Sequence, residues 1–251
     1  MFGIPDVFFG ALLAFAATGA GAACLLLIKN VGKKEHLAII AFSSGVMLYA
    51  AWEMISQAHG EAGLETALIG FALGGAALFA MEKLIPHAHA FVKGKRAAGM
   101  SEKGKKAVLI GGTITLHNIP EGFAIASAFA ASSPLGWLVS VSIAVQDFPE
   151  GLIVSAPLSA YGMSKKQSVL WGVFSGAVEA AAAVIGFVLI STITSLTPIA
   201  LAFSAGAMAF VTFFELLPDA FSCKDRRMPA LSLAAGLVAA YLIAALLAVT
   251  Q

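Results

Sequence analysis

Two short segments of the sequence share one unusual order of polar residues, proline, glutamate and glycine. One segment reads His117-Asn-Ile-Pro-Glu121-Gly, and the other reads Gln146-Asp-Phe-Pro-Glu150-Gly. On a helix, side chains four residues apart share a face, so His117 lies beside Glu121 and Gln146 beside Glu150. An imidazole, carboxylates and amides without a thiolate suit borderline or hard divalent cations such as Zn²⁺, Fe²⁺, Mn²⁺ or Cd²⁺. The paired motif therefore indicates a metal site.

The surroundings of these motifs are strongly apolar. The chain has 251 residues, of which 59% are hydrophobic and 12% are charged, and its mean hydropathy is +0.91. This composition excludes an ordinary soluble domain and indicates a membrane protein. An ionised carboxylate in hydrocarbon costs several kcal/mol unless something compensates its charge. Because the only Lys or Arg inside the predicted spans is Lys83, close to the end of its span, the compensation has to come from protons, metal ions or water.

Apolar runs between clusters of charged and turn residues predict an all-α polytopic membrane protein with eight transmembrane helices. We expect one transporter domain over residues 1–251, with a single long cytoplasmic connection at 87–106. The predicted spans are 6–28, 37–58, 65–86, 107–131, 136–158, 167–190, 198–218 and 229–250.

Basic residues follow a simple rule along this pattern. All 15 Lys and Arg residues fall at alternate connections, and the intervening connections carry none. The positive-inside rule then places those connections in the cytoplasm and both termini outside. A net charge of +1 that is segregated in this way argues against a nucleic-acid partner and for the lipid bilayer as the surroundings.

The two motifs form an internal repeat across consecutive helices. Neighbouring spans run in opposite directions, so the two copies are expected to be related by a pseudo-two-fold axis in the membrane plane, with the site near the midplane. A fainter echo joins Gly45-x-Met47 to Gly206-x-Met208. We therefore expect inverted-repeat symmetry that relates helices 1–3 to helices 6–8 and helix 4 to helix 5.

The two motifs, together with the segment Gly-Ala-Val-Glu179-Ala in the sixth span, resemble the ZIP (Zrt/Irt-like) family of divalent-metal transporters, in particular its bacterial GufA-type branch. The resemblance covers the whole chain. It implies uptake of Zn²⁺, with Fe²⁺, Mn²⁺ or Cd²⁺ as other substrates, across the inner membrane into the cytoplasm. The metal is then cargo and not a cofactor, and the protein is a transporter and not an enzyme.

The resemblance further implies a binuclear site in the middle of the bundle. One metal position would be held by His117, Glu121, Gln146 and Glu150, with Met47 as an additional ligand. The other would be held by Asn118, Glu121, Asp147, Glu150 and Glu179. Many family members have His where this chain has Gln146. The family also suggests an elevator-like movement of helices 1, 4, 5 and 6 past helices 2, 3, 7 and 8, and a homodimer as one form of assembly.

Several polar residues flank the predicted site, and each has two interpretations. Glu53 and His59 form an entrance for cations or are solvated at the interface. Glu215 and Asp219, four residues apart near a cytoplasmic end, guide release or are solvated there. His87 and His89 resemble a short remnant of a His-rich loop that captures metal in many family members, or they belong to a basic loop that serves topology and attraction to anionic lipid.

Two other classes of function use the same residues. An intramembrane metal-dependent hydrolase would activate water on the metal, but the sequence has no His-Glu-x-x-His signature. A metal-free proton pathway would use the carboxylates, but the amides of Asn118 and Gln146 do not titrate and suit a coordination shell better. Metal transport is the interpretation that uses all of these side chains.

Overall fold

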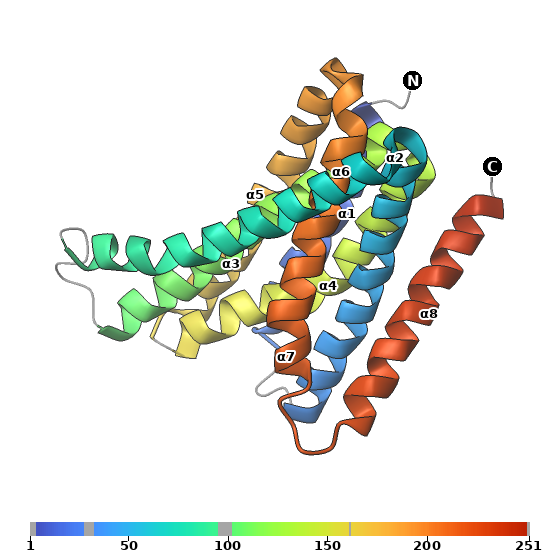
Figure 1. Ribbon diagram of the computed structural model, residues 1–251. Coiled ribbons are helices and arrows are strands. Elements are labelled where there is room, and N and C mark those ends of the chain that lie inside the picture. The colour runs from blue at the N-terminus through green and yellow to red at the C-terminus, as the bar shows by residue number, and fades with distance from the viewer. Residues whose placement is uncertain (1–3, 28–32, 95–101, 161, 250–251) are drawn as a thin grey trace.

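The computed structural model describes residues 4–27, 33–94, 102–160 and 162–249, with the backbone alone at residues 4, 33, 82, 84–94, 102–116 and 249. The described chain is entirely helical apart from turns (Figure 1). Its α-helices are α1 (Ile4–Cys24), α2 (Lys33–Gly94), α3 (Glu102–Ala131), α4 (Ser133–Ala160), α5 (Lys165–Thr192), α6 (Thr197–Val211), α7 (Leu217–Ala220) and α8 (Arg227–Val249).

The helices are those of a polytopic membrane protein. Within the described residues, six helical segments are long and apolar enough to cross a membrane by length and composition. Large apolar side chains are exposed along them, such as Leu231 on α8 and Leu170 on α5, which are 73% and 65% exposed. Exposure on this scale is expected where lipid replaces water as the solvent.

Helix α2 consists of two helical segments joined at Gly63. This glycine has φ 80° and ψ 170°, a backbone conformation that side chains with a Cβ rarely adopt. Figure 1 shows the two segments pointing in different directions, blue before the bend and teal after it. The predicted spans 37–58 and 65–86 lie on either side of this residue, so the predicted turn between them is a bend at one glycine.

The predicted connection at 87–106 is shorter than expected. Helix α2 continues to Gly94 and α3 already begins at Glu102, while residues 95–101 lie outside the described residues. The physical reason is that Lys, Ala and Glu are good helix formers even where they are polar. Charge alone therefore predicts an end of α2 that is too early and a start of α3 that is too late.

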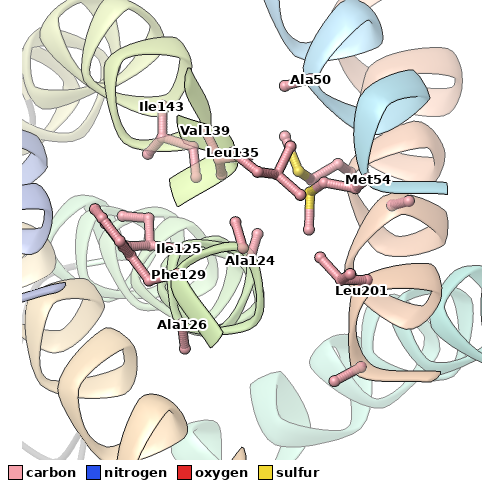
Figure 2. Packing of buried hydrophobic residues seen from close by; sticks show 14 of the residues in the cluster. Ala50, Met54, Ala124, Ile125, Ala126, Phe129, Leu135, Val139, Ile143 and Leu201 are labelled. Atoms are coloured by element: carbon pink, nitrogen blue, oxygen red, sulfur yellow. The ribbon is translucent and has the colours of Figure 1, made fainter. Parts of the chain in front are cut away.

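Two groups of helices can be distinguished by their packing. Helices α1, α3, α4 and α5 pack mainly against one another, and α2 packs with α6 and α8. An apolar core joins the groups, with Met54 from α2, Ala124 from α3, Leu135 from α4 and Leu201 from α6 (Figure 2). The site described below lies next to this core.

The seventh predicted span, 198–218, contains an irregularity that the sequence did not predict. After α6, residues Thr212–Leu216 form a π-helical segment, and α7 follows directly. Such π-segments occur frequently at functional sites. This one carries Glu215.

Candidate metal site

Helices α3 and α4 place the two motifs, and the glycine that ends each motif sets how closely a neighbouring helix approaches. A Cβ on Gly122 would overlap the backbone oxygen of Glu179 on α5. A Cβ on Gly151 would overlap the backbone oxygen of Thr18 on α1. The motif therefore requires glycine at both places, because any side chain would push α5 or α1 away.

Three carboxylates from three helices converge at the centre of the bundle. Oxygen atoms of Glu121 on α3, Asp147 on α4 and Glu179 on α5 all lie within 4.8 Å of one another. Glu121 is 4% exposed, and Asp147 and Glu179 are 0% exposed. The prediction that the fourth, fifth and sixth spans bring acids together is consistent with this cluster.

These carboxylates have few hydrogen-bond donors around them. Among the described residues, no hydrogen-bond donor reaches either carboxylate oxygen of Asp147 or of Glu179, or Oε2 of Glu121. Buried anionic oxygens without donors cost free energy unless a proton or a cation compensates them. Oxygen atoms at this spacing are suitable ligands for a divalent cation.

Gln146 connects the cluster to the fourth carboxylate. Its Nε2 donates to Oε1 of Glu121 over 2.8 Å and to Oε2 of Glu150 over 2.5 Å. Both glutamates of the paired motif thus face one another across the side chain of Gln146. This is the arrangement expected if Glu121 and Glu150 together hold a positive charge.

His117 lies at the other edge of the site. Its Nε2 is 3.4 Å from Oε1 of Glu215, which the π-helical segment presents from the second group of helices. Glu215 thereby adjoins the first motif although it lies almost a hundred residues further along the chain. No local pattern in the sequence predicts the pairing, since it depends on how α6 and α7 cross α3.

A cavity of about 300 Å³ opens onto these residues. It is lined by Ile40, Ser43, His117, Glu121, Gln146, Pro149, Glu150, Ile153, Val211, Glu215, Leu216 and Asp219. Ser43 was not predicted as a site residue, although it is one of two consecutive serines in an otherwise apolar run. The cavity brings the predicted exit residues Glu215 and Asp219 together with both motifs.

The remaining predicted residues lie outside this cavity. Met47 is fully buried in the apolar core, with its sulfur 3.9 Å from the hydroxyl of Thr212. Asn118 is fully buried beside His117. Glu53 is half-buried, and its carboxylate is hydrogen-bonded to Tyr49 one turn earlier.

Of the predicted histidines outside the motifs, only His59 has a described side chain. His59 is exposed near the bend of α2. His87 and His89 fall on the backbone of α2, but their side chains lie outside the described residues. His59 is not among the described residues that line the cavity.

Comparison with known proteins shows extended similarity. Residues 100–247 match the family model described as ZIP Zinc transporter. The chain is 33% identical over 220 residues to the zinc transporter GufA of Myxococcus xanthus, covering 83% of this chain and 85% of the relative. It is 33% identical over 245 residues to the zinc transporter ZupT of Corynebacterium glutamicum, covering 90% and 93%. A ZupT of Salmonella newport is 30% identical over 237 residues, covering 90% and 91%.

Proposed function

From the premise that the chain belongs to the ZIP family of zinc transporters, we propose that it moves divalent transition-metal cations, chiefly Zn²⁺, across the inner membrane into the cytoplasm. The observation that carries this proposal is the cluster of Glu121, Asp147 and Glu179, whose buried oxygens lie within 4.8 Å of one another. A divalent cation neutralises such a cluster where hydrocarbon surrounds it. Fe²⁺, Mn²⁺ and Cd²⁺ suit the same oxygen and imidazole ligands.

The proposed centre holds two cations. Glu121 and Glu150 would bridge them, because both carboxylates contact the same side-chain nitrogen of Gln146. One cation would share these bridges with His117 and Gln146, and the other with Asn118, Asp147 and Glu179. Four carboxylates balance the charge of two divalent ions. Met47 is proposed only as an additional ligand, since it is buried in the apolar core.

We propose that the chain crosses the membrane eight times, counting the two segments of α2 separately and α6 with α7 as one. Helix α1 begins and α8 ends at the same end of the bundle (Figure 1), as an even number of crossings requires. The alternation of basic connections favours both termini outside.

Close contacts at glycines support the proposed inverted repeat. A Cβ on Gly74 would overlap the backbone oxygen of Phe203, and a Cβ on Gly236 would overlap that of Phe42. Phe42 and Phe203 are 161 residues apart, and Gly74 and Gly236 are 162 residues apart. The same type of helix crossing thus occurs twice, and the corresponding residues in the two halves of the chain are separated by nearly the same number of positions.

A second pair of contacts has the same offset. Gly45 packs against the backbone oxygen of Leu233, and Gly206 packs against that of Phe71. Gly45 and Gly206 are 161 residues apart. They are the glycines of the faint Gly-x-Met echo, which supports helices 1–3 and 6–8 as counterparts.

The direction of release follows from the position of the cavity. Ile40 and Ser43 lie near the start of α2, shortly after Lys33 and Lys34 in the sequence, and Asp219 lies near the end of α7, shortly before the basic residues at 224–227. Toward the opposite end, Met54 and Leu201 are buried in the core shown in Figure 2. We propose that this state is open toward the cytoplasm, with Glu215 and Asp219 on the exit path. Glu53 and His59 are proposed for the outer entrance.

The two groups of helices are suited to an elevator-like movement. The interface between α3 and α6 contains small residues, such as Ala124 and Ala205, both fully buried. The hydroxyls of Ser127 and Ser204 are 3.1 Å apart across this interface. Small side chains leave a smooth surface along which α1, α3, α4 and α5 could slide past α2, α6 and α8.

The test is uptake of radioactive zinc by the purified full chain in proteoliposomes. We expect uptake of zinc to be saturable. Unlabelled cadmium and manganese should each inhibit it in a concentration-dependent way. Hydrolysis and proton flux are measured in the same vesicles, since the alternative functions predict those activities instead. Uptake no faster than in protein-free liposomes would overturn the proposal.

A further inference from the structure

The glycine contacts at the site define a counterpart for Glu179. A Cβ on Gly122 would overlap the backbone oxygen of Glu179 and lie 2.9 Å from the backbone nitrogen of Ala183. A Cβ on Gly151 would overlap the backbone oxygen of Thr18 and lie 2.8 Å from the backbone nitrogen of Ala22. In both cases the motif glycine contacts a neighbouring helix at the same place. It lies between a backbone carbonyl of that helix and the backbone nitrogen four residues later in the chain.

The number of residues that separates Thr18 from Glu179 equals the separation found for other equivalent positions in the two halves of the chain. Thr18 precedes Glu179 by 161 residues, and Ala22 precedes Ala183 by the same number. This is the offset that relates Gly45 to Gly206 and Phe42 to Phe203. Position 18 on α1 is therefore the structural equivalent of position 179 on α5.

Equivalent backbones direct equivalent side chains. Because the Cβ direction is fixed by the helix backbone, we infer that Thr18 is directed toward the α4 half of the site in the way that Glu179 is directed toward the α3 half. Thr18 is 0% exposed, and a Cβ on Gly176, one turn before Glu179, would lie 3.1 Å from its Oγ1. The side chain thus faces the interior where α1, α4 and α5 meet.

Thr18 can offer an oxygen to a cation. Its hydroxyl donates to the backbone oxygen of Ala14 over 3.1 Å. A hydroxyl that donates its proton still has two acceptor lone pairs. Oxygen of this kind suits the same hard or borderline ions that the four carboxylates suit.

We propose that Thr18 is the α1 member of the metal site and a specificity-determining residue. This inference rests on the proposed function. Thr18 mirrors Glu179 across the pseudo-two-fold axis, and its neutral oxygen stands where exact symmetry would put a fifth carboxylate. The site consequently has four acids, Glu121, Asp147, Glu150 and Glu179, whose charge two divalent ions balance. A carboxylate at position 18 would leave one buried negative charge uncompensated.

The first test replaces the hydroxyl with a thiol of similar size. Thr18→Cys is made with Cys24→Ala and Cys223→Ser, so that no other thiol is present, and the purified full chain is titrated with CdCl₂. We expect the ultraviolet charge-transfer absorption of a cadmium–thiolate bond and a preference for Cd²⁺ over Mn²⁺ that rises at least tenfold, because thiolate is a soft ligand.

The matched control is Thr197→Cys in the same background. Thr197 is also buried, at 5% exposure, but it lies at the start of α6. It should give no such absorption. Absence of the band in Thr18→Cys, while cadmium binds as in the parent, would overturn the role of Thr18 alone. If the parent chain binds neither zinc nor cadmium, the proposed function itself fails.

A second test exchanges the two equivalent positions. Glu179→Thr should lose at least tenfold in zinc affinity, and adding Thr18→Glu should restore most of it, since the carboxylate returns from the opposite helix. Thr18→Gln with Glu179→Thr matches the size without the charge and should not rescue. A folded Thr18→Glu, Glu179→Thr protein that binds zinc no better than Glu179→Thr contradicts the proposal. If that variant does not fold, the thiol test decides.

Discussion

Gln146 places its side-chain nitrogen 2.8 Å from Oε1 of Glu121, the carboxylate of the other motif. The same nitrogen also donates to Glu150, so one amide group holds together the two acids proposed to bridge the metals. On the proposed site, a cation that binds between these acids would displace that contact, and the amide would turn its oxygen toward the metal. Position 146 would then influence the affinity for the metal.

Gln146→His should tighten zinc binding, on the order of tenfold, because imidazole is a stronger ligand than an amide oxygen and its ring does not have to give up two hydrogen bonds to carboxylates. Isothermal titration of the purified chain measures the change. Gln146→Leu keeps the bulk without a ligand and should bind more weakly than the parent. A histidine variant that binds no tighter than the leucine variant would contradict this assignment.

Glu121→Ala and Glu150→Ala should nearly abolish zinc uptake, since each removes a bridge shared by both proposed metal positions. The proteins should remain folded and inserted in the membrane, as judged by size-exclusion chromatography. The measurement is radioactive zinc uptake in proteoliposomes. Normal uptake by either variant rejects the bridging role.

Asp147→Ala and Glu179→Ala should have a milder effect, because both residues belong to only one of the two proposed metal positions. We expect the zinc content to fall from two ions to one per chain, with lower affinity or rate in transport. Elemental analysis of the purified variants measures the stoichiometry. An unchanged stoichiometry in both variants would refute the two-ion site.

Gly122→Ala and Gly151→Ala should separate helices that now touch. The added methyl would overlap the backbone oxygen of Glu179 or of Thr18, and overpacking of this kind costs about 1–3 kcal/mol. Thermal unfolding in detergent should show a lower Tm, and zinc binding should weaken with it, since α5 and α1 move away from the site.

Gly60→Ala is the matched control for these glycines. Gly60 lies within the helical part of α2, and a Cβ there would meet nothing within 4 Å. Alanine should therefore be neutral or stabilising, by about 0.5–1 kcal/mol, through its better helix propensity. A loss of stability at Gly60 equal to that at Gly122 would show that close packing is not the cause.

Ile153→Cys should react with a membrane-impermeant thiol reagent from the cytoplasmic side, because Ile153 lines the cavity. Met54→Cys should not react, because Met54 is 0% exposed in the apolar core. Both are made without the native cysteines, and labelling is followed in inside-out vesicles with and without zinc. An Ile153→Cys protein that reacts in right-side-out vesicles and not in inside-out vesicles would contradict the proposed direction of opening.

The sequence predicted the central acids because two separate constraints agreed on them. Glu121 and Glu150 stand in repeated motifs, and Glu179 is a carboxylate in an apolar run without a basic partner. The proximity of Glu215 to His117 could not be predicted, since it depends on the π-helical segment and on the crossing of helices distant in the chain.

Helix ends were predicted less well than the helices themselves. The charged residues after position 86 predict the end of a span, but α2 continues to Gly94, because leaving the membrane does not require the helix to stop. Thr18 had no signal of its own in the sequence. Its relation to Glu179 appears only when the contacts of Gly122 and Gly151 are compared.

The hydroxyl pair of Ser127 and Ser204 has an energetic consequence for turnover. A polar contact between membrane helices contributes about 0.6 kcal/mol on average, which corresponds to roughly a threefold bias in population. If α3 travels along α6, every cycle has to break this bond in surroundings that offer little water to replace it. The pair would then slightly slow the return from the inward-open to the outward-open state. It would set the population of the inward-open state in the absence of metal without contacting the metal itself.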